Sequence, residues 1–238
     1  MEKFRYKLAV LLFTLCLVTP AFSVYSQDYR RTGDVTFITG EMVAPTIYRE
    51  AMEAYNTGNA LMRQGNYAEA EPYFLKAIEI DNDFIDAIDH LALVYRHLRR
   101  YDESESFYLL SIEKNQSNLV PYINLAMLYR VQGRLEDARQ TYLRAQKIDP
   151  DDPEPYFGIA VLYQLVGQYE TSKGFALIAI EKYREKESLL IGDAFYVQAN
   201  NFYYLEEFEE ALKLYRAALV FNPDREFIKN IIEEIENM

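Results

Sequence analysis

Two histidines, His90 and His97, are the side chains of this chain whose type and spacing could hold a metal ion. Seven residues are nearly two helical turns, so both would project from one side of a helix, together with Asp86. A carboxylate and two imidazoles are ligands that a divalent metal accepts. The histidines would nevertheless lie about 10 Å apart along the helix axis, which is too far for one ion. We therefore interpret them as surface or groove histidines and predict no metal site and no cofactor.

No other arrangement of residues indicates catalysis. The sequence contains no Gly-rich phosphate loop, no nucleophile elbow and no cysteine–histidine pair. Four glutamates gather between Glu206 and Glu210, but they straddle an expected turn between helices and are interpreted as a solvated acidic surface. We predict that the protein is not an enzyme.

The charge balance disfavours two classes of partner. The chain of 238 residues carries a net charge of −12. Lys3, Arg5 and Lys7 against Glu2 give the segment 1–23 a charge of +2, so the remainder stands at −14. A chain this acidic repels nucleic acid and anionic lipid head groups unless a basic stripe compensates, and no such stripe is found. We expect no nucleic-acid partner and no direct membrane insertion of the mature chain.

The segment 1–23 has the features of a secretory signal. A basic start is followed by the apolar run Leu8–Val18 and then by the small-residue site Ala21-Phe22-Ser23. The run is shorter than the roughly 20 residues that span a bilayer, so an uncleaved anchor is the weaker alternative. Cys16, the single cysteine, lies in this run after the large Leu15, which disfavours lipidation. We expect an exported, periplasmic protein whose mature form has no disulfide.

A 34-residue pattern recurs five times after this segment. The copies fall at 51–84, 85–118, 119–152, 153–186 and 192–225, with a five-residue insertion at 187–191. Large residues recur where two helices would face each other, and small residues recur where their backbones would cross. In the third copy these positions are Tyr122, Leu125, Ala126, Tyr129, Gly133, Leu135, Ala138, Tyr142, Ala145 and Pro150.

This pattern closely resembles the tetratricopeptide repeat (TPR), with a tyrosine in place of the usual opening tryptophan. The resemblance implies an all-α fold: a right-handed superhelical TPR solenoid of five helical hairpins over residues 46–238, ending in a capping helix at 226–238. It also implies a scaffold that holds other proteins. Since one helical hairpin cannot bury its apolar face alone, neighbouring copies must stack.

Small residues fix the register of the five copies. They let the helix axes approach closely, while aromatic residues fill the space beside them. The three small columns are Gly58, Ala92, Ala126, Ala160 and Ala199; Ala70, Ser104, Ala138, Ser172 and Ala211; and Ala77, Ser111, Ala145, Ala179 and Ala218.

Two segments flank the repeats. Residues 24–45 contain a stretch rich in β-branched residues, Asp34–Thr39, and we expect an extended arm or one isolated strand that lies on the array or in its groove. The last segment has an apolar face (Phe227, Ile228, Ile231, Ile232 and Ile235) that should seal the fifth copy. A homodimer contact through that face is the alternative.

In this family the first helix of each repeat lines the concave side. Carried over by register, the partner-binding positions of this chain are Tyr55, Asp89, Ile123, Phe157 and Tyr196; Asn59, Leu93, Met127, Val161 and Asn200; and Arg96, Arg130 and Tyr203. The basic clamp with which some members grip a chaperone tail is absent, because its second positions are Met52, Asp86, Val120, Glu154 and Asp193.

The predicted floor is apolar in its middle and carries two arginines one repeat apart. Arg96 and Arg130 could each bind a carboxylate or a backbone carbonyl of a partner. In the simpler interpretation, Arg96 pairs with Asp89 or Asp86 inside the array. An extended or helical protein segment with apolar side chains would suit this surface.

The favoured function is an exported scaffold that docks a protein or peptide in its groove, within a bacterial envelope assembly. The alternative is a carrier or receptor accessory that holds a small apolar ligand in the aromatic interior. A third option is self-association without another ligand.

Overall fold

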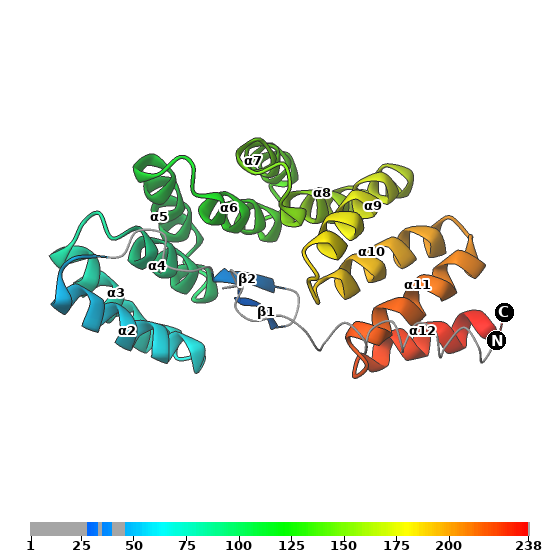
Figure 1. Cartoon of the computed structure of the whole chain (residues 1–238), viewed down its shortest axis with the longest axis horizontal. Coiled ribbons are helices and arrows are strands. Elements are labelled where there is room, and N and C mark those ends of the chain that lie inside the picture. Colours follow the sequence, from blue (N-terminus) through cyan, green and yellow to red (C-terminus); the bar gives the residue numbers. More distant parts are fainter. Residues whose placement is uncertain (1–27, 33–34, 40–45, 238) are drawn as a thin grey trace, which may run out of the picture.

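The computed structural model describes residues 28–32, 35–39 and 46–237. Over these ranges the chain forms a curved array of helices with a short β-hairpin inside the curve (Figure 1). The predicted signal at 1–23 and much of the predicted arm at 24–45 lie outside the described residues. The helices are α2 (Arg49–Arg63), α3 (Tyr67–Ile80), α4 (Ile85–His97), α5 (Tyr101–Lys114), α6 (Leu119–Val131), α7 (Leu135–Ile148), α8 (Pro153–Leu165), α9 (Tyr169–Glu185), α10 (Ile191–Tyr204), α11 (Phe208–Phe221) and α12 (Glu226–Glu236).

The helices contact one another as successive pairs. The first pair is α2 with α3, the last is α10 with α11, and the second helix of each pair also contacts the first helix of the next. Contact between neighbours alone is the arrangement that defines a solenoid, because each unit completes its core with the next one. The predicted all-α solenoid is confirmed for the helical array.

The small columns that set the register are buried throughout the array. Ala92, Ala126 and Ala160 have no exposed surface, and neither have Ser104 and Ser172 opposite two of them. The Ser104 hydroxyl donates to the carbonyl oxygen of Ala92 at 2.7 Å, and the Ser172 hydroxyl donates to that of Ala160 at 2.8 Å. A serine is therefore tolerated at the helix crossing because its hydroxyl has an acceptor there.

Each helical pair is joined by a turn with one residue in the left-handed region. Gly65, Gly133 and Gly167 fill this position in three repeats, with φ between +72° and +83°. Arg99 and Glu206 fill it in the other two, with φ of +59° and +62°. Glycine has no Cβ to clash in this region, so the two non-glycine residues carry local strain.

The insertion at 187–191 lengthens both the helix and the loop of the fourth repeat. Helix α9 has 17 residues, against 14 in α7. The extension includes Tyr183, which is fully buried and whose hydroxyl donates to the buried carboxylate of Glu154 on α8. The longer helix thus adds an aromatic side chain to the core between α8 and α9.

A β-hairpin precedes the array and corrects one expectation. Strand β2 (Val35–Thr39) pairs with β1 (Asp28–Thr32) as an antiparallel ladder, with Asp28 opposite Thr39 and Thr32 opposite Val35. The expectation of an extended arm or one isolated strand was wrong, because β1 (DYRRT) has a single β-branched residue, Thr32, and its composition indicates a strand only weakly. The Gly33-Asp34 dipeptide between the strands was the missed signal, since Gly-Asp is a two-residue hairpin connection.

The last helix covers the end of the array. Helix α12 lies against α11, with Ile228 and Ile235 buried in the same cluster as Tyr215. An ion pair between Arg216 and Glu236 joins the two helices. No helix among the described residues is long and apolar enough to cross a membrane.

Candidate functional site

The predicted partner-binding residues lie on the first helices of the repeats. Helices α4, α6, α8 and α10 follow one another along the inner side of the arc, and the hairpin lies within this curve (Figure 1). Strand β2 contacts α6 directly. One part of the concave side is therefore already in contact with another segment of the same chain.

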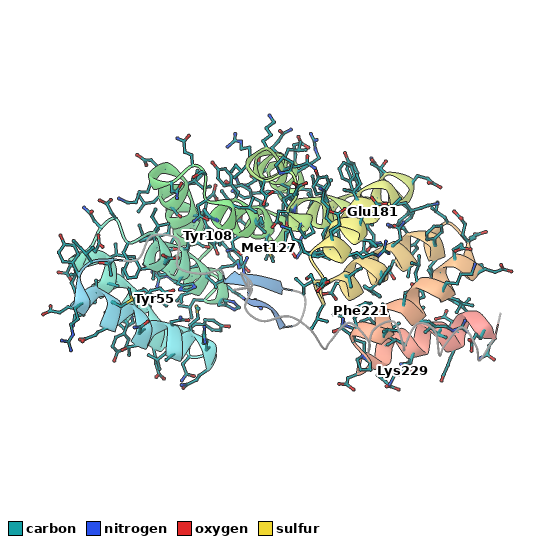
Figure 2. All side chains as sticks on the ribbon, viewed as in Figure 1. Tyr55, Tyr108, Met127, Glu181, Phe221 and Lys229 are labelled. Carbon is teal, nitrogen blue, oxygen red and sulfur yellow. The ribbon has the colours of Figure 1, made fainter. Side chains whose placement is uncertain are left out.

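The part of the floor formed by α4 and α6 is buried. Leu93 on α4 is 3% exposed, and Ile123 and Met127 on α6 are 1% and 4% exposed. On α6 every residue from Pro121 to Tyr129 is buried, which is unusual for a helix that should present one side to solvent. Met127 lies on the inner side of the arc beside the hairpin (Figure 2).

The part formed by α8 and α10 is more open. Phe157 and Val161 on α8 are partly exposed, as are the three predicted residues of α10, namely Tyr196, Asn200 and Tyr203. Helix α8 has a neighbouring repeat on each side, as α6 has, so its place in the array does not explain the difference. The structure thus divides the predicted site into a covered half (Leu93, Ile123 and Met127) and an open half (Phe157, Val161, Tyr196, Asn200 and Tyr203).

The two predicted arginines occupy different environments. Arg96 is 5% exposed, and its Nη1 lies 3.5 Å from the carbonyl oxygen of Asn124 on α6. Arg130 is only partly buried. Arg96 therefore links α4 to α6 and offers little surface to a partner.

Asp89 lies in the buried region between α4, α5 and α6. Its Oδ2 accepts a hydrogen bond from Nδ2 of Asn118 at 3.2 Å. Burial raises the pKa of the Asp89 carboxyl to about 7, opposed by hydrogen bonding to Ser111 and reinforced by the nearby charge of Asp86. Because Asp89 is buried, it supports the floor from within and offers little surface to a partner.

The first repeat contributes one buried and one accessible position. The ring of Tyr55 is buried against Phe84 and Phe74, with ring centroids 4.9 and 5.8 Å away, and stacks on His90 at 5.3 Å. Asn59, one turn further along α2, is partly exposed. Tyr55 is therefore an interior contact between the first two repeats.

The open half is lined mainly by aromatic side chains. The ring of Tyr196 meets that of Phe227 on α12 edge-on at 5.4 Å, and Tyr203 meets Tyr204 edge-on at 5.6 Å. Asn200 accepts a hydrogen bond from the Tyr215 hydroxyl at 2.7 Å, so it is held by the core. The exposed Phe227 and Tyr204 were not predicted as site residues, because Phe227 was assigned to the sealing face of the last helix.

The histidines are packing residues in the structure. The ring of His97 stacks on Tyr67 at 3.9 Å, as that of His90 does on Tyr55. Burial lowers the pKa of each histidine to about 4, so both are neutral near pH 7. Among the described residues no group of three histidine, cysteine or acidic side chains could hold a metal ion.

Comparison with known proteins identifies the class of protein that this arrangement represents. Profiles described as tetratricopeptide repeat match residues 51–84, 87–119 and 107–140, and one described as TPR repeat matches residues 127–167. With these matches and the stacked helical pairs, the chain belongs to the tetratricopeptide repeat family. No curated protein matches the chain.

Solved structures with the same fold are distant in sequence. A thermophilic TPR protein of Thermus thermophilus is 17% identical, with a TM-score of 0.63 over 79% of this chain and 100% of that one. YrrB, described as a TPR protein with an unusual peptide-binding site, is 20% identical, with a TM-score of 0.55 over 77% of this chain and 92% of that one. A chain of the APC/C hetero-tetramer Cut9–Hcn1 is 16% identical, with a TM-score of 0.70 over 79% of this chain but 36% of that one. At these identities the likeness shows the fold alone.

Proposed function

We propose that this protein is a scaffold that binds a segment of another protein in its concave groove, first through the open half of that groove. The observation that carries the proposal is the partial exposure of Phe157, Val161, Tyr196 and Tyr203 on two neighbouring helices of the array. Partly exposed apolar and aromatic residues on a rigid concave surface are what a protein interface uses as anchors. The peptide-binding site in the description of YrrB is consistent with such a use of the fold.

The chemistry of the open half favours an apolar partner segment. Its predicted polar residue, Asn200, is already hydrogen-bonded to Tyr215, and Gln164 beside it donates to Asn201 Oδ1 at 2.8 Å and to the Val197 carbonyl at 3.0 Å. What remains for a partner is aromatic and aliphatic surface, which suits a segment with at least two apolar side chains.

We also propose that the protein is exported and works within a bacterial envelope assembly. The support is the sequence of the segment 1–23, with its basic start, short apolar run and small-residue site. Fractionation of the source cells and N-terminal sequencing of the recovered protein test this part. Recovery from the cytoplasm with the segment 1–23 intact contradicts it.

The binding proposal is tested by photo-crosslinking from two positions. A photoreactive residue is placed at Val161 in the open half and, as a matched control, at Glu181, an exposed residue on the outer side of α9 (Figure 2). The full chain is irradiated in its source cells, and the products are identified by mass spectrometry. We expect a discrete protein product from Val161 and none from Glu181.

A second measurement checks the recovered partner with purified components. Tyr203→Ser in the open half should weaken its binding at least tenfold, whereas Tyr73→Ser, at a tyrosine that is 39% exposed on α3, should leave it unchanged. Equal products from Val161 and Glu181 would refute the groove as the binding site. If Val161 gives no protein product and solvent extraction of the purified protein releases an apolar compound, the carrier function replaces the scaffold.

A further inference from the structure

We propose that the β1–β2 hairpin is a displaceable occupant of the α6 part of the covered half of the groove, and that an extended segment of the partner competes with it for the floor formed by α6. This inference deepens the proposed function and rests on it. It makes the groove a surface for a β-strand segment, with the protein's own strand held there until a partner arrives.

The difference between α6 and α8 is the first observation. Both helices lie in the middle of the array with a repeat on each side, yet Ile123 and Met127 on α6 are 1% and 4% exposed, whereas Phe157 and Val161 at the matching positions of α8 are partly exposed. Strand β2 contacts α6. At α6 the greater burial therefore coincides with the hairpin, whereas Leu93 on α4, which the hairpin does not contact, is buried by the helices.

The second observation is the small size of the occupant. The hairpin has two strands of five residues each. A two-stranded hairpin alone is marginally stable in water, so its place on the array depends on the contact it makes there. An occupant of this kind can leave without disturbing the stacked helical pairs, whose contacts do not include it apart from α6.

The chemistry of the floor indicates which segment can take its place. Ile123 and Met127 on α6 form an apolar surface that is costly to leave in water, so departure of the hairpin favours entry of another apolar segment. The resident strand β2 has the sequence VTFIT, which is rich in β-branched and aromatic residues. We therefore assign the covered half to an extended segment of similar composition.

The two halves are continuous along the inner side of the arc. Helix α6 of the covered half and α8 of the open half are in contact. A partner that binds first to the open half is thereby held beside the hairpin, and its neighbouring residues compete at a high effective concentration. Binding in the open half and displacement in the covered half become two steps of one event.

Thiol accessibility tests whether the hairpin covers the floor. Met127→Cys is made in a Cys16→Ser background, so that the introduced thiol is the only one in the full chain. Its rate of reaction with a small alkylating reagent is compared with and without the double change Val35→Pro and Phe37→Pro, which removes two amides on the side of β2 that faces β1. Val161→Cys on α8 is the matched control, and circular dichroism monitors the helices.

We expect the Met127→Cys thiol to react at least tenfold faster once the strand is broken, and the Val161→Cys thiol to react at the same rate in both backgrounds. An unchanged slow reaction at Met127→Cys would mean that the helices alone bury the floor, and it would overturn the proposal. A fast reaction with the hairpin intact would overturn it too. Ile123→Cys on α6 repeats the test if the first variant fails to fold.

Competition tests the kind of segment that the floor accepts. A synthetic peptide of residues 28–39 is added to the strand-broken Met127→Cys protein, and a scrambled peptide of the same composition serves as control. We expect the native peptide alone to restore slow alkylation. No protection by either peptide would overturn the assignment to an extended segment, while crosslinking from Val161 would still report on the scaffold function independently.

Discussion

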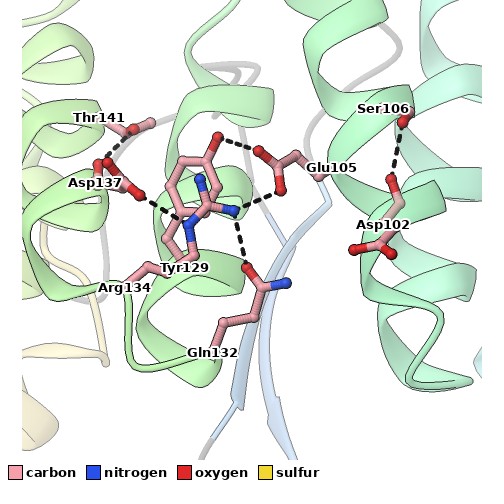
Figure 3. Close-up of polar contacts among 8 residues, drawn as sticks. All are labelled: Asp102, Glu105, Ser106, Tyr129, Gln132, Arg134, Asp137 and Thr141. Carbon is pink, nitrogen blue, oxygen red and sulfur yellow. Dashed lines mark hydrogen bonds and ion pairs between the residues drawn. The ribbon is translucent and has the colours of Figure 1, made fainter.

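Arg134, on the turn after α6, lies with its Nη1 2.7 Å from Oε2 of Glu105 on α5 and so ties the third repeat to the second (Figure 3). The other oxygen of Glu105 accepts a hydrogen bond from the Tyr129 hydroxyl at 2.8 Å, and the Arg134 guanidinium lies 4.1 Å from the centre of the Tyr129 ring. Asp137 completes the cluster with a contact to Nε of Arg134 at 2.8 Å.

The same cluster occurs one repeat earlier in the chain. Arg100 lies 2.8 Å from Glu71 and 2.9 Å from Glu103, and its guanidinium is 4.2 Å from the centre of the Tyr95 ring. The next joint lacks it, because Gln168 stands at the arginine position and Arg139 at the glutamate position. Two of the contacts between neighbouring repeats thus share one polar clamp, in which an arginine is held by two carboxylates over the ring of Tyr95 or Tyr129.

Removing this clamp should weaken the array. Arg134→Ala is expected to lower the free energy of unfolding by about 1 kcal/mol, because a partly exposed charge network and a cation–π contact are lost together. Urea unfolding followed by circular dichroism measures the change, which should shrink in high salt. Arg49→Ala, which removes an ion pair between two well-exposed side chains, is the control and should change stability little. Equal losses of stability in the two variants would mean that the clamp contributes no more than an exposed ion pair.

The strained turn of the second repeat offers a stabilising change. Arg99 has a φ of +59°, where three other repeats have glycine, so Arg99→Gly should raise the free energy of unfolding by about 1 kcal/mol. Thermal or urea unfolding measures the gain. Gln132→Gly tests the opposite case at a turn residue with an ordinary φ of −78°, and it should not stabilise. A loss of stability in Arg99→Gly would indicate that the arginine side chain makes a contact worth more than the strain.

Two glycines inside helices should respond oppositely to alanine. A Cβ added at Gly158 on α8 would overlap the ring of Tyr142 on α7, so Gly158→Ala should destabilise by about 1–3 kcal/mol. A Cβ at Gly174 on α9 meets no atom within 4 Å, so Gly174→Ala should stabilise by about 0.5–1 kcal/mol through helix propensity. Urea midpoints of the two variants measure both changes. A shift of the same sign in both would contradict the close approach of α7 and α8.

Asp89 should make stability fall as the pH rises. Its pKa is raised to about 7 by burial, whereas the unfolded chain has the ordinary carboxyl value near 4. Between these values the native state holds a proton that the unfolded state has lost, so the contribution of this group is complete below about pH 4 and is lost as the pH rises through 7. The free energy of unfolding of Asp89→Asn, relative to that of the wild type, should therefore rise between pH 5 and pH 8. A constant difference in urea stability across this range would contradict the raised pKa.

His90 should act in the opposite direction. Its pKa is lowered to about 4 by burial, so between about 4 and the ordinary value near 6.5 the unfolded chain binds a proton that the native state excludes. The contribution of His90 is complete above about pH 6.5 and is lost as the pH falls towards 4. His90→Phe keeps an aromatic ring against Tyr55 and Phe74 and should reduce the loss of stability between pH 7 and pH 5. Urea unfolding curves at pH 7 and pH 5 measure this loss of stability. An unchanged loss in His90→Phe would mean that other groups cause the acid sensitivity.

The sequence predicts a groove along the first helices of the repeats, and the structure leaves the predicted positions unequally exposed. Register alone puts Met127 and Val161 at equivalent positions, because they lie one repeat apart. The structure buries the first and leaves the second partly exposed. A repeat pattern describes contacts between neighbours, and it carries no information about a distant segment that returns to the groove.

The sequence by itself determined the local and nearest-neighbour features of this protein: the helical pairs, their stacking and the small residues at each crossing. These follow from the regular period of the repeats, because each helix buries its apolar face on elements close to it in the chain. Tertiary structure alone decided that β2 lies on α6, that Arg96 is buried against Asn124, and that Phe227 lines the open half beside Tyr196. These contacts join residues far apart in the sequence or without periodic order, so they depend on the shape of the finished arc.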